Sequence, residues 1–376
     1  MNYKIVAFFL GFACLSLAAN AQQEIKWWNP QGSAINAIEG QGWQGEYESF
    51  YDRLPLRAKS VVRPAVWARS KFSSGLTIRF KTNSPHIQVR YKVAGRLTLP
   101  TMPAVAASGV DLYAVVGDKY YWCRPATTFR DTIVYKYTGL KPTPGYYDEG
   151  VEYKLFLPPY NSILSLEIGV YKDKMFMPLV PRDELPIVVY GTSITQGGCA
   201  SRPGMTWTSI LQRHLNRPVI NLGFSGNGRL EPEVINLVCE LDAAVYVLDC
   251  LANLTSAKLY DNEKLEALIM DAVKDIRAKH PDTPIVLTDH DGYTSGFEGA
   301  VSQRRYYNYY SRVNKVMDKA FAKLKKQGVK LIYHLTHDDI DQSPDGKVDG
   351  THPNDLGMMR IATAYEKIIR EILNEK

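Results

Sequence analysis

The sequence predicts two domains: an antiparallel β-sandwich over residues 22–180, followed by an α/β domain with a parallel sheet over residues 184–376. A length of 376 residues favours two domains. In the first region, apolar and polar residues alternate along short segments, a pattern typical of half-buried antiparallel strands. In the second, apolar runs alternate with helical spacing, as in parallel sheets covered by helices. With 45% hydrophobic and 22% charged residues, the composition indicates a globular protein.

The first 21 residues predict a secretory signal peptide. Lys4 precedes an apolar run over residues 5–18, and Ala19-Asn20-Ala21 forms an A-x-A cleavage site. The run is too short to cross a membrane. Lipoprotein processing at Cys14 fits less well, because it would leave apolar residues at the mature N-terminus. We therefore expect cleavage after Ala21 and a secreted or periplasmic protein without a transmembrane segment.

Charge and cysteine content set limits on partners and cofactors. Loss of Lys4 with the leader lowers the formal net charge of +6 by one, and the basic residues are scattered apart from short helical clusters, so we expect no nucleic-acid partner. The spacing of the remaining cysteines shows no zinc pattern, and an oxidising compartment would permit one or two disulfides. Cys199 and Cys250 form a candidate pair, since both lie near the expected sheet edge. The other two are Cys123 and Cys239.

Strands are expected in the first domain at residues 76–80, 86–91, 132–137 and 162–168. Gly117-Asp118 separates apolar runs at 112–116 and 120–122, which predicts a tight hairpin. Prolines and a glycine within residues 142–145 predict a longer loop, and residues 177–184 predict a stiff linker between the domains.

Tryptophan and tyrosine are frequent in this domain, including Trp27, Trp28, Trp43 and Trp67. Such side chains either stack against sugar rings or fill the core of a β-sandwich. The second role is the more common one, and the Trp27-Trp28 pair is the strongest candidate for the first.

The second domain alternates strands and helices. Strands are expected at 187–190, 219–222, 243–248, 285–287 and 329–333. Helices are expected at 206–215, with Thr206 as N-cap, and at 231–240, 262–280, 303–327 and 353–374.

Polar residues follow each of these strands. Since carboxyl ends of parallel strands meet at one edge of a sheet, where open α/β sheets bind ligands, we expect these residues to gather on one rim. The segments are Ser193, 221–228, 249–253, 289–291 and, after a polar loop, 349–354.

Three of these rim residues form a candidate catalytic triad for ester cleavage, which needs a nucleophile, a base and an orienting acid. Ser193 supplies the hydroxyl, His352 is the candidate base, and Asp349 lies three residues before it, within reach through a turn. A Gly-x-Ser alone is more often a turn or helix cap, and a lone Asp-x-x-His more often a surface turn. Their joint presence on one rim favours the catalytic interpretation.

Donors for an oxyanion are also available on this rim. The candidates are the backbone N–H groups of Ser193 and Gly226 and the side-chain amide of Asn253. Singly, the glycine loop could be an ordinary flexible loop and Asn253 a helix cap. His290 and Asp291, with Asp289, either contact substrate or cap a strand end, and both interpretations stay open.

Two competing constellations fail. The α/β-hydrolase elbow, G-x-S-x-G, has a second glycine where this chain has Thr195, and its acid lies well before the histidine. Residues 341–346 match the start of a calcium loop, but His352 stands where such a loop needs its bidentate glutamate. We therefore expect no metal and no other cofactor.

The rim motifs resemble those of the SGNH, or GDSL-like, hydrolase family. Residues 191–195 are similar to its nucleophile block, 221–226 to its second block, and 349–353 to its last, with acid and base. The family's third block reads Gly-x-Asn-Asp, and residues 251–254 keep only Asn253 of it. In the first domain, residues 109–113 resemble the Gly-x-Asp-Leu-Tyr signature of a β-domain that precedes one SGNH subgroup.

This resemblance implies a flavodoxin-like three-layer hydrolase domain without a metal, preceded by a jelly-roll-like β-sandwich. Because family members often deacylate carbohydrates, we expect a secreted serine esterase that removes acetyl or other short acyl groups from carbohydrate esters. The family also includes lipases and thioesterases, so the fold does not determine the substrate. The alternatives are a hydrolase of lipid or other small acyl esters and a non-catalytic carbohydrate-binding protein on the same scaffold.

Overall fold

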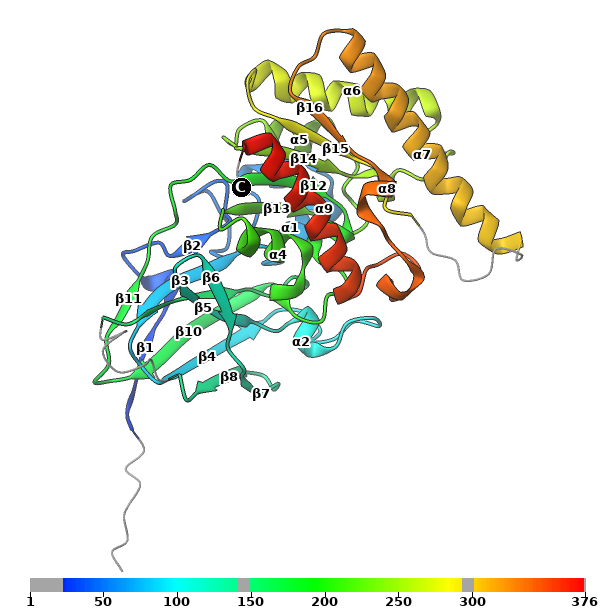
Figure 1. Ribbon diagram of the computed structural model, residues 1–376. Coiled ribbons are helices and arrows are strands. Elements are labelled where there is room, and N and C mark those ends of the chain that lie inside the picture. Colours follow the sequence, from blue (N-terminus) through cyan, green and yellow to red (C-terminus); the bar gives the residue numbers. More distant parts are fainter. Residues whose placement is uncertain (1–22, 141–148, 293–300, 375–376) are drawn as a thin grey trace, which may run out of the picture.

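The computed structural model describes residues 23–140, 149–292 and 301–374. Antiparallel sheets form the N-terminal region and a parallel sheet with helices forms the C-terminal domain, as the sequence predicts (Figure 1). The predicted signal peptide and the loop predicted at 142–145 lie outside the described residues.

The N-terminal region is a sandwich of two antiparallel sheets. One sheet has the order β1-β10-β4-β8-β7, and the other has the order β11-β3-β9-β5-β6, with β2 paired to β3. Inward-facing residues of both sheets, such as Val89 and Phe80, share one core because side chains alternate along each strand. The strands are β1 (Ile25–Trp28), β2 (Ile38–Glu39), β3 (Thr77–Thr82), β4 (His86–Val93), β5 (Asp111–Val116), β6 (Lys119–Trp122), β7 (Ala126–Thr128), β8 (Ile133–Thr138), β9 (Val151–Phe156), β10 (Ile163–Tyr171) and β11 (Phe176–Pro178).

The predicted hairpin is confirmed, with Val116 opposite Lys119 and Gly117 at a φ of +58° in the turn. The linker prediction is wrong at its start. Met177 and Pro178 belong to β11, which pairs with β3 and is an edge strand of its sheet, where a residue without an N–H is tolerated.

The C-terminal domain is a three-layer α/β/α structure. Its parallel sheet has the order β13-β12-β14-β15-β16, the flavodoxin-like order. The strands are β12 (Ile187–Gly191), β13 (Val219–Gly223), β14 (Val245–Asp249), β15 (Ile285–Thr288) and β16 (Ile332–Leu335). The prediction for β16 began three residues early, because Leu331 takes a left-handed conformation (φ +54°) and the strand starts only after it.

Helices cover both faces of this sheet. α4 (Trp207–His214) and α9 (Asp355–Leu373) share one core, where Trp207 stacks on Tyr365 at 4.3 Å. α5 (Pro232–Val238), α6 (Asn262–Lys279) and α7 (Val301–Lys326) share the other. In Figure 1, α6 and α7 lie together at the top of this domain, and α9 crosses in front of the sheet. The shorter helices are α1 (Pro64–Ser70), α2 (Ala104–Ala107), α3 (Ser193–Gln196) and α8 (His337–Ile340).

One part of residues 22–180 does not belong to the sandwich core. Trp43, Leu54 and Val66 are buried in the same core as α5 and α6, against the parallel sheet. Trp43 also donates a hydrogen bond from Nε1 to Glu240 at 2.7 Å. The N-terminal region therefore contributes packing to the hydrolase domain, which the alternating pattern could not indicate.

The Trp27-Trp28 pair is half-buried. The Arg90 guanidinium lies 3.8 Å from the centre of the Trp27 ring, and Trp28 packs on Phe176 at 5.2 Å. Both rings have partners within the protein, which favours a structural role.

Candidate active site

Ser193 begins α3, one residue after β12, the strand that lies between β13 and β14. Thr192 is the N-cap, and its hydroxyl accepts a hydrogen bond from the backbone N–H of Ile194 at 3.3 Å. Gly197 ends this single turn in a left-handed conformation (φ +102°). The serine side chain is therefore held at the carboxyl edge of the sheet by a capped turn.

The structure brings Ser193, His352 and Asp349 together in one hydrogen-bonded chain. Ser193 Oγ lies 2.9 Å from His352 Nε2, and His352 Nδ1 lies 2.8 Å from Asp349 Oδ2. The second carboxylate oxygen, Asp349 Oδ1, accepts the backbone N–H groups of Thr351 (3.0 Å) and His352 (2.8 Å). Partial burial opposes ionisation of Asp349, but these hydrogen bonds outweigh it and lower the pKa of the carboxyl. An ionised Asp349 keeps the His352 proton on Nδ1 and leaves Nε2 free to accept the serine proton.

The three candidate oxyanion donors follow strand ends: Ser193 begins α3 after β12, Gly226 lies in the segment after β13, and Asn253 ends a short 3-10 helix after β14. Gly226 has a φ of +73°, a conformation that favours glycine. The side-chain carbonyl of Asn253 accepts the N–H of Gly228 at 3.1 Å, which fixes the amide and leaves its NH₂ group for another acceptor. A Cβ at Gly228 would lie 2.1 Å from the carbonyl oxygen of Gly191, so the loop approaches the nucleophile strand closely. Their role as oxyanion donors stays a prediction.

Asp289, His290 and Asp291 are buried beneath the rim. Asp289 accepts hydrogen bonds from His334 Nε2 (2.8 Å) and from the backbone N–H of His337 (3.1 Å), so it acts as a cap between strand ends. His290 Nδ1 accepts the N–H of Gly292 at 2.9 Å. This burial argues against the predicted substrate contact by His290 and Asp291, and favours a supporting role.

Asp249 lies at the end of β14 and bonds to the nucleophile turn through Thr195 Oγ1 at 3.0 Å. Burial, assisted by the nearby charge of Asp291, raises the pKa of Asp249 to about 7. Sequence analysis placed this residue in a rim segment but gave it no role, because an aspartate at a strand end resembles any helix cap.

The β-domain reaches the nucleophile turn. Tyr160 donates a hydrogen bond from its hydroxyl to the carbonyl oxygen of Ser193 (3.2 Å), and Ser74 does the same to that of Gln196 (2.6 Å). Gln196 in turn accepts the N–H of Ser225, in the candidate oxyanion loop, at 2.8 Å. These contacts join residues distant in sequence, so no local pattern could have indicated them.

The Gly-x-Asp-Leu-Tyr segment lies at the contact between the domains. Asp111 pairs with Arg202, which follows the nucleophile turn, and accepts the backbone N–H of Gly204 at 3.0 Å. Arg202 also donates to the hydroxyl of Tyr113 at 2.7 Å. The acidic and aromatic residues of this segment therefore attach the β-domain to the chain that leaves the active site.

The candidate disulfide between Cys199 and Cys250 is wrong, because the two thiols have different neighbours. Cys199 Sγ lies 3.2 Å from Thr101 Oγ1, and Cys250 Sγ lies 3.5 Å from the carbonyl oxygen of Tyr190. All the cysteines in the described part of the chain are free thiols.

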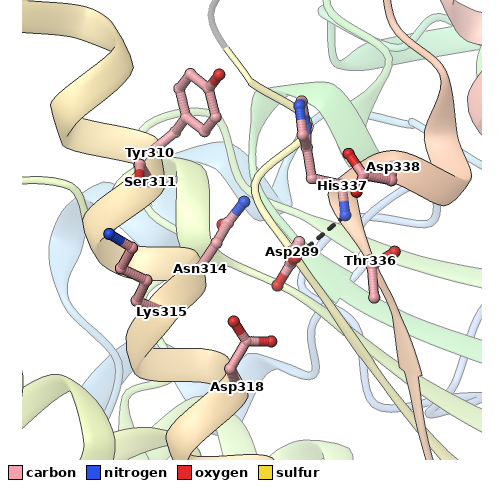
Figure 2. A pocket seen from close by; sticks show the side chains of 9 residues that line it. All are labelled: Asp289, Tyr310, Ser311, Asn314, Lys315, Asp318, Thr336, His337 and Asp338. Carbon is pink, nitrogen blue, oxygen red and sulfur yellow. Dashed lines mark hydrogen bonds between the residues drawn. The ribbon is translucent and has the colours of Figure 1, made fainter.

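A hollow of about 470 Å³ lies between α7 and the ends of β15 and β16, and no triad residue lines it. Figure 2 shows side chains of α7 facing Asp289 and the start of α8, with the bond from the His337 N–H to Asp289 dashed. Its lining consists of Asp289, Tyr310, Ser311, Asn314, Lys315, Asp318, Thr336, His337 and Asp338.

Across residues 23–140, 149–292 and 301–374, no cluster of histidine, cysteine and acidic residues could hold a metal ion. The helices described there include none long and apolar enough to cross a membrane.

Both halves of the chain match known protein families. Residues 184–370 match the GDSL-like lipase/acylhydrolase family, and residues 25–176 match the GxDLY domain, the N-terminus of SGNH-hydrolase-type esterases. The chain matches none of the curated proteins with which it was compared.

Solved structures share the whole architecture. A GDSL-like lipase from Bacteroides ovatus is 31% identical, with a TM-score of 0.82, over 94% of this chain and 99% of that one. The salicylyl-acyltransferase SsfX3 of a tetracycline biosynthetic pathway is 20% identical, with a TM-score of 0.68, over 94% and 99%. An acetyl xylan esterase from the rumen bacterium Butyrivibrio proteoclasticus is 10% identical, with a TM-score of 0.55, over 93% and 99%. The latter two likenesses show the fold alone.

The family matches at both ends, together with the 31% identity over nearly the full length of a solved relative, establish that this chain belongs to the GDSL-like (SGNH) lipase/acylhydrolase family and is a carboxylic ester hydrolase with an N-terminal GxDLY domain.

Proposed function

We propose that this protein is a secreted serine esterase that removes acetyl or other short acyl groups from carbohydrate esters. The observation that carries the proposal is the hydrogen-bonded chain from Ser193 through His352 to Asp349. It supplies a nucleophile, a base and an orienting acid at the edge where α/β sheets bind ligands.

In this mechanism, Ser193 Oγ attacks the ester carbonyl carbon while His352 Nε2 accepts the serine proton. Asp349 stabilises the resulting imidazolium through its bond to Nδ1. The N–H groups of Ser193 and Gly226 and the amide of Asn253 stabilise the oxyanion. His352 then protonates the departing sugar oxygen, and water hydrolyses the acyl-enzyme by the reverse sequence of proton transfers.

A carbohydrate ester as the substrate is supported by the fold likeness to an acetyl xylan esterase, which extends over nearly the whole chain. Export is supported by the features of residues 1–21. N-terminal sequencing of the protein from its native host tests this part, and we expect the mature chain to begin at Gln22. A mature chain that keeps the leader would refute export by this route.

A lipid ester is the second candidate, and apolar exposure near the catalytic histidine favours it. Val348 is 47% exposed and Leu356 is 46% exposed, each within four residues of His352. Exposed apolar side chains beside an active site are suited to an acyl chain.

A chain-length series of 4-nitrophenyl esters separates the two candidates, with Ser193→Ala as the control. For a carbohydrate deacetylase we expect the highest kcat/KM on acetate, with a steep fall toward octanoate, and acetate release from acetylated xylan. A preference for octanoate would favour the lipid candidate. Equal acetate release by wild type and Ser193→Ala would refute the mechanism, and no turnover of any ester would leave only a binding role.

A further inference from the structure

Asp349 and His352 lie on an irregular segment, residues 346–354, which we name the catalytic loop. The loop contains one isolated bridge, between Lys347 and Pro353, and two internal backbone hydrogen bonds, from Val348 N–H to the His352 carbonyl oxygen and from Asn354 N–H to the Gly346 carbonyl oxygen, each 2.9 Å. The triad side chains on it are only partly buried. Packing alone therefore does not fix the positions of these side chains relative to Ser193.

Lys347 is the buried connection between this loop and the sheet. Its side chain is 1% exposed, and its ammonium group pairs with Asp291, whose side chain is 6% exposed. The same ammonium donates to the carbonyl oxygen of Thr351 at 3.0 Å, in the residue before His352. A single charged group thus joins the end of β15 to the backbone next to the catalytic base.

The nucleophile turn is tied to the neighbouring strand in a similar way. Thr195 bonds to Asp249 at the end of β14, and β14 pairs directly with β15. Asp249 and Asp291 line the same small internal cavity. The separation between Ser193 and His352 is therefore set through two adjacent strand ends, one tied to the nucleophile and the other to the base.

The charges around Lys347 are consistent with a fixed ion pair. Burial opposes ionisation of Asp291, but the Lys347 ammonium outweighs it and lowers the pKa of that carboxyl to about 2. A buried pair of this kind is a weak source of stability compared with apolar side chains of equal size. Here the pair fixes the position of the loop, because one ammonium group binds a carboxylate and a carbonyl oxygen at the same time.

We propose that Lys347, through Asp291 and the Thr351 carbonyl, is a positioning residue for the triad. It touches neither substrate nor the reacting atoms. The proposal rests on the proposed esterase function, since a triad that does not react needs no positioning.

The test compares Lys347→Met with a variant that also removes the partner charge, Lys347→Met/Asp291→Asn. The single variant leaves a buried carboxylate unpaired and is expected to melt at a lower temperature. The double variant removes both charges and is expected to regain most of the melting temperature. In both, Thr351 lacks its donor, so we expect kcat for 4-nitrophenyl acetate to fall about 100-fold while KM changes less than about threefold.

Lys154→Met is the matched control. Lys154 is equally buried and pairs with Glu39, but in the β-domain and away from the triad. We expect it to lower the melting temperature without changing kcat of the folded protein.

A second readout does not depend on turnover. The low-field proton NMR signal of the His352 Nδ1–H bound to Asp349 is expected in wild type and Lys154→Met, and shifted or lost in both Lys347 variants. A double variant with wild-type kcat and an unchanged signal would overturn the proposal. If wild type hydrolyses no ester, the proposed function fails, and the NMR comparison still decides whether Lys347 positions the loop.

Discussion

Arg53 provides the sharpest test of how the N-terminal region supports the active site. It is 1% exposed and lies in the segment that packs into the hydrolase domain. Within the described residues its guanidinium donates to neutral groups, and the pKa of Arg53 is lowered to about 9 by burial. The backbone acceptors are the carbonyl oxygens of Phe72 (2.7 Å), Arg69 (2.7 Å), Asn221 (2.9 Å) and Gly223 (2.8 Å).

Arg53→Met keeps most of the apolar stem but removes this donor from the carbonyl groups of Phe72, Asn221 and Gly223, whereas the Arg69 carbonyl still accepts the backbone N–H of Phe72 at 3.2 Å. For three orphaned acceptors at about 1–3 kcal/mol each, the summed cost is roughly 3–9 kcal/mol. Relief of the guanidinium's own burial offsets part of that cost. We therefore expect the free energy of unfolding to fall by about 4 kcal/mol. Two of the acceptors, Asn221 and Gly223, lie just before the loop that holds the candidate oxyanion donor Gly226. We expect that loop to shift when the donor is lost, and kcat to fall as a result.

The assay is urea denaturation of Arg53→Met beside Arg57→Met. Arg57 belongs to the same segment and pairs with two carboxylates, Glu46 and Glu240, but its side chain is 48% exposed. Exposed ion pairs contribute about 0–1 kcal/mol, so this control should lose little stability. If Arg57→Met lowers the free energy of unfolding more than Arg53→Met does, the number of ion pairs matters more than buried hydrogen bonding, and the reasoning is refuted.

Three further predictions concern the active site. Asp349→Asn should lower kcat about 10⁴-fold, because the amide no longer holds His352 in the reactive tautomer; pre-steady-state and steady-state kinetics check this, and a loss below tenfold would contradict it. Asp249→Asn should change the slope of stability against pH between pH 4 and 7. The folded protein keeps the Asp249 proton to about pH 7, whereas the unfolded chain releases it near 3.8, so the contribution of this group to stability falls as pH rises, by up to about 1.4 kcal/mol per unit. Thermal melts of both proteins across this range measure the slope, and equal slopes would contradict the raised pKa. Gly228→Ala should reduce both stability and kcat, because the new methyl group would lie 2.1 Å from the Gly191 carbonyl oxygen; unchanged melting and kcat would show that the loop can move aside.

Local chemistry made much of the fold predictable. Alternation of apolar residues identified β4 and β8, and the apolar runs from Ile187 and Val219 identified strands of the parallel sheet. These signals are reliable because a strand buried on one face alternates apolar and polar residues, whereas a strand buried on both faces is a continuous apolar run. The hairpin at Gly117 was predictable for a similar reason, since its turn requires a residue that accepts a positive φ.

The candidate triad was also predictable, because its residues stand at strand ends or in one short motif. Ser193 follows a strand directly, and Asp349 and His352 are three residues apart. Parallel strands place their carboxyl ends on one edge, so adjacency in space followed from topology. Whether a hydrogen-bonded chain forms was not predictable, since that depends on distances of a few tenths of an ångström.

Only the tertiary structure showed what supports the triad. Arg53, Tyr160 and Lys347 each act through bonds to backbone carbonyl groups, and a carbonyl group carries no sequence signature. The burial of His290 and Asp291 was likewise undecided by the sequence, because a polar residue after a strand can face solvent or turn beneath the rim.

The sequence by itself thus determined the two fold classes, the sheet edge of the candidate site and the residues suited to it, because periodicity and strand-end placement are local properties. The tertiary structure decided which residues hold the candidate triad in place, and that the β-domain contributes some of them, because those bonds join segments brought together only by folding.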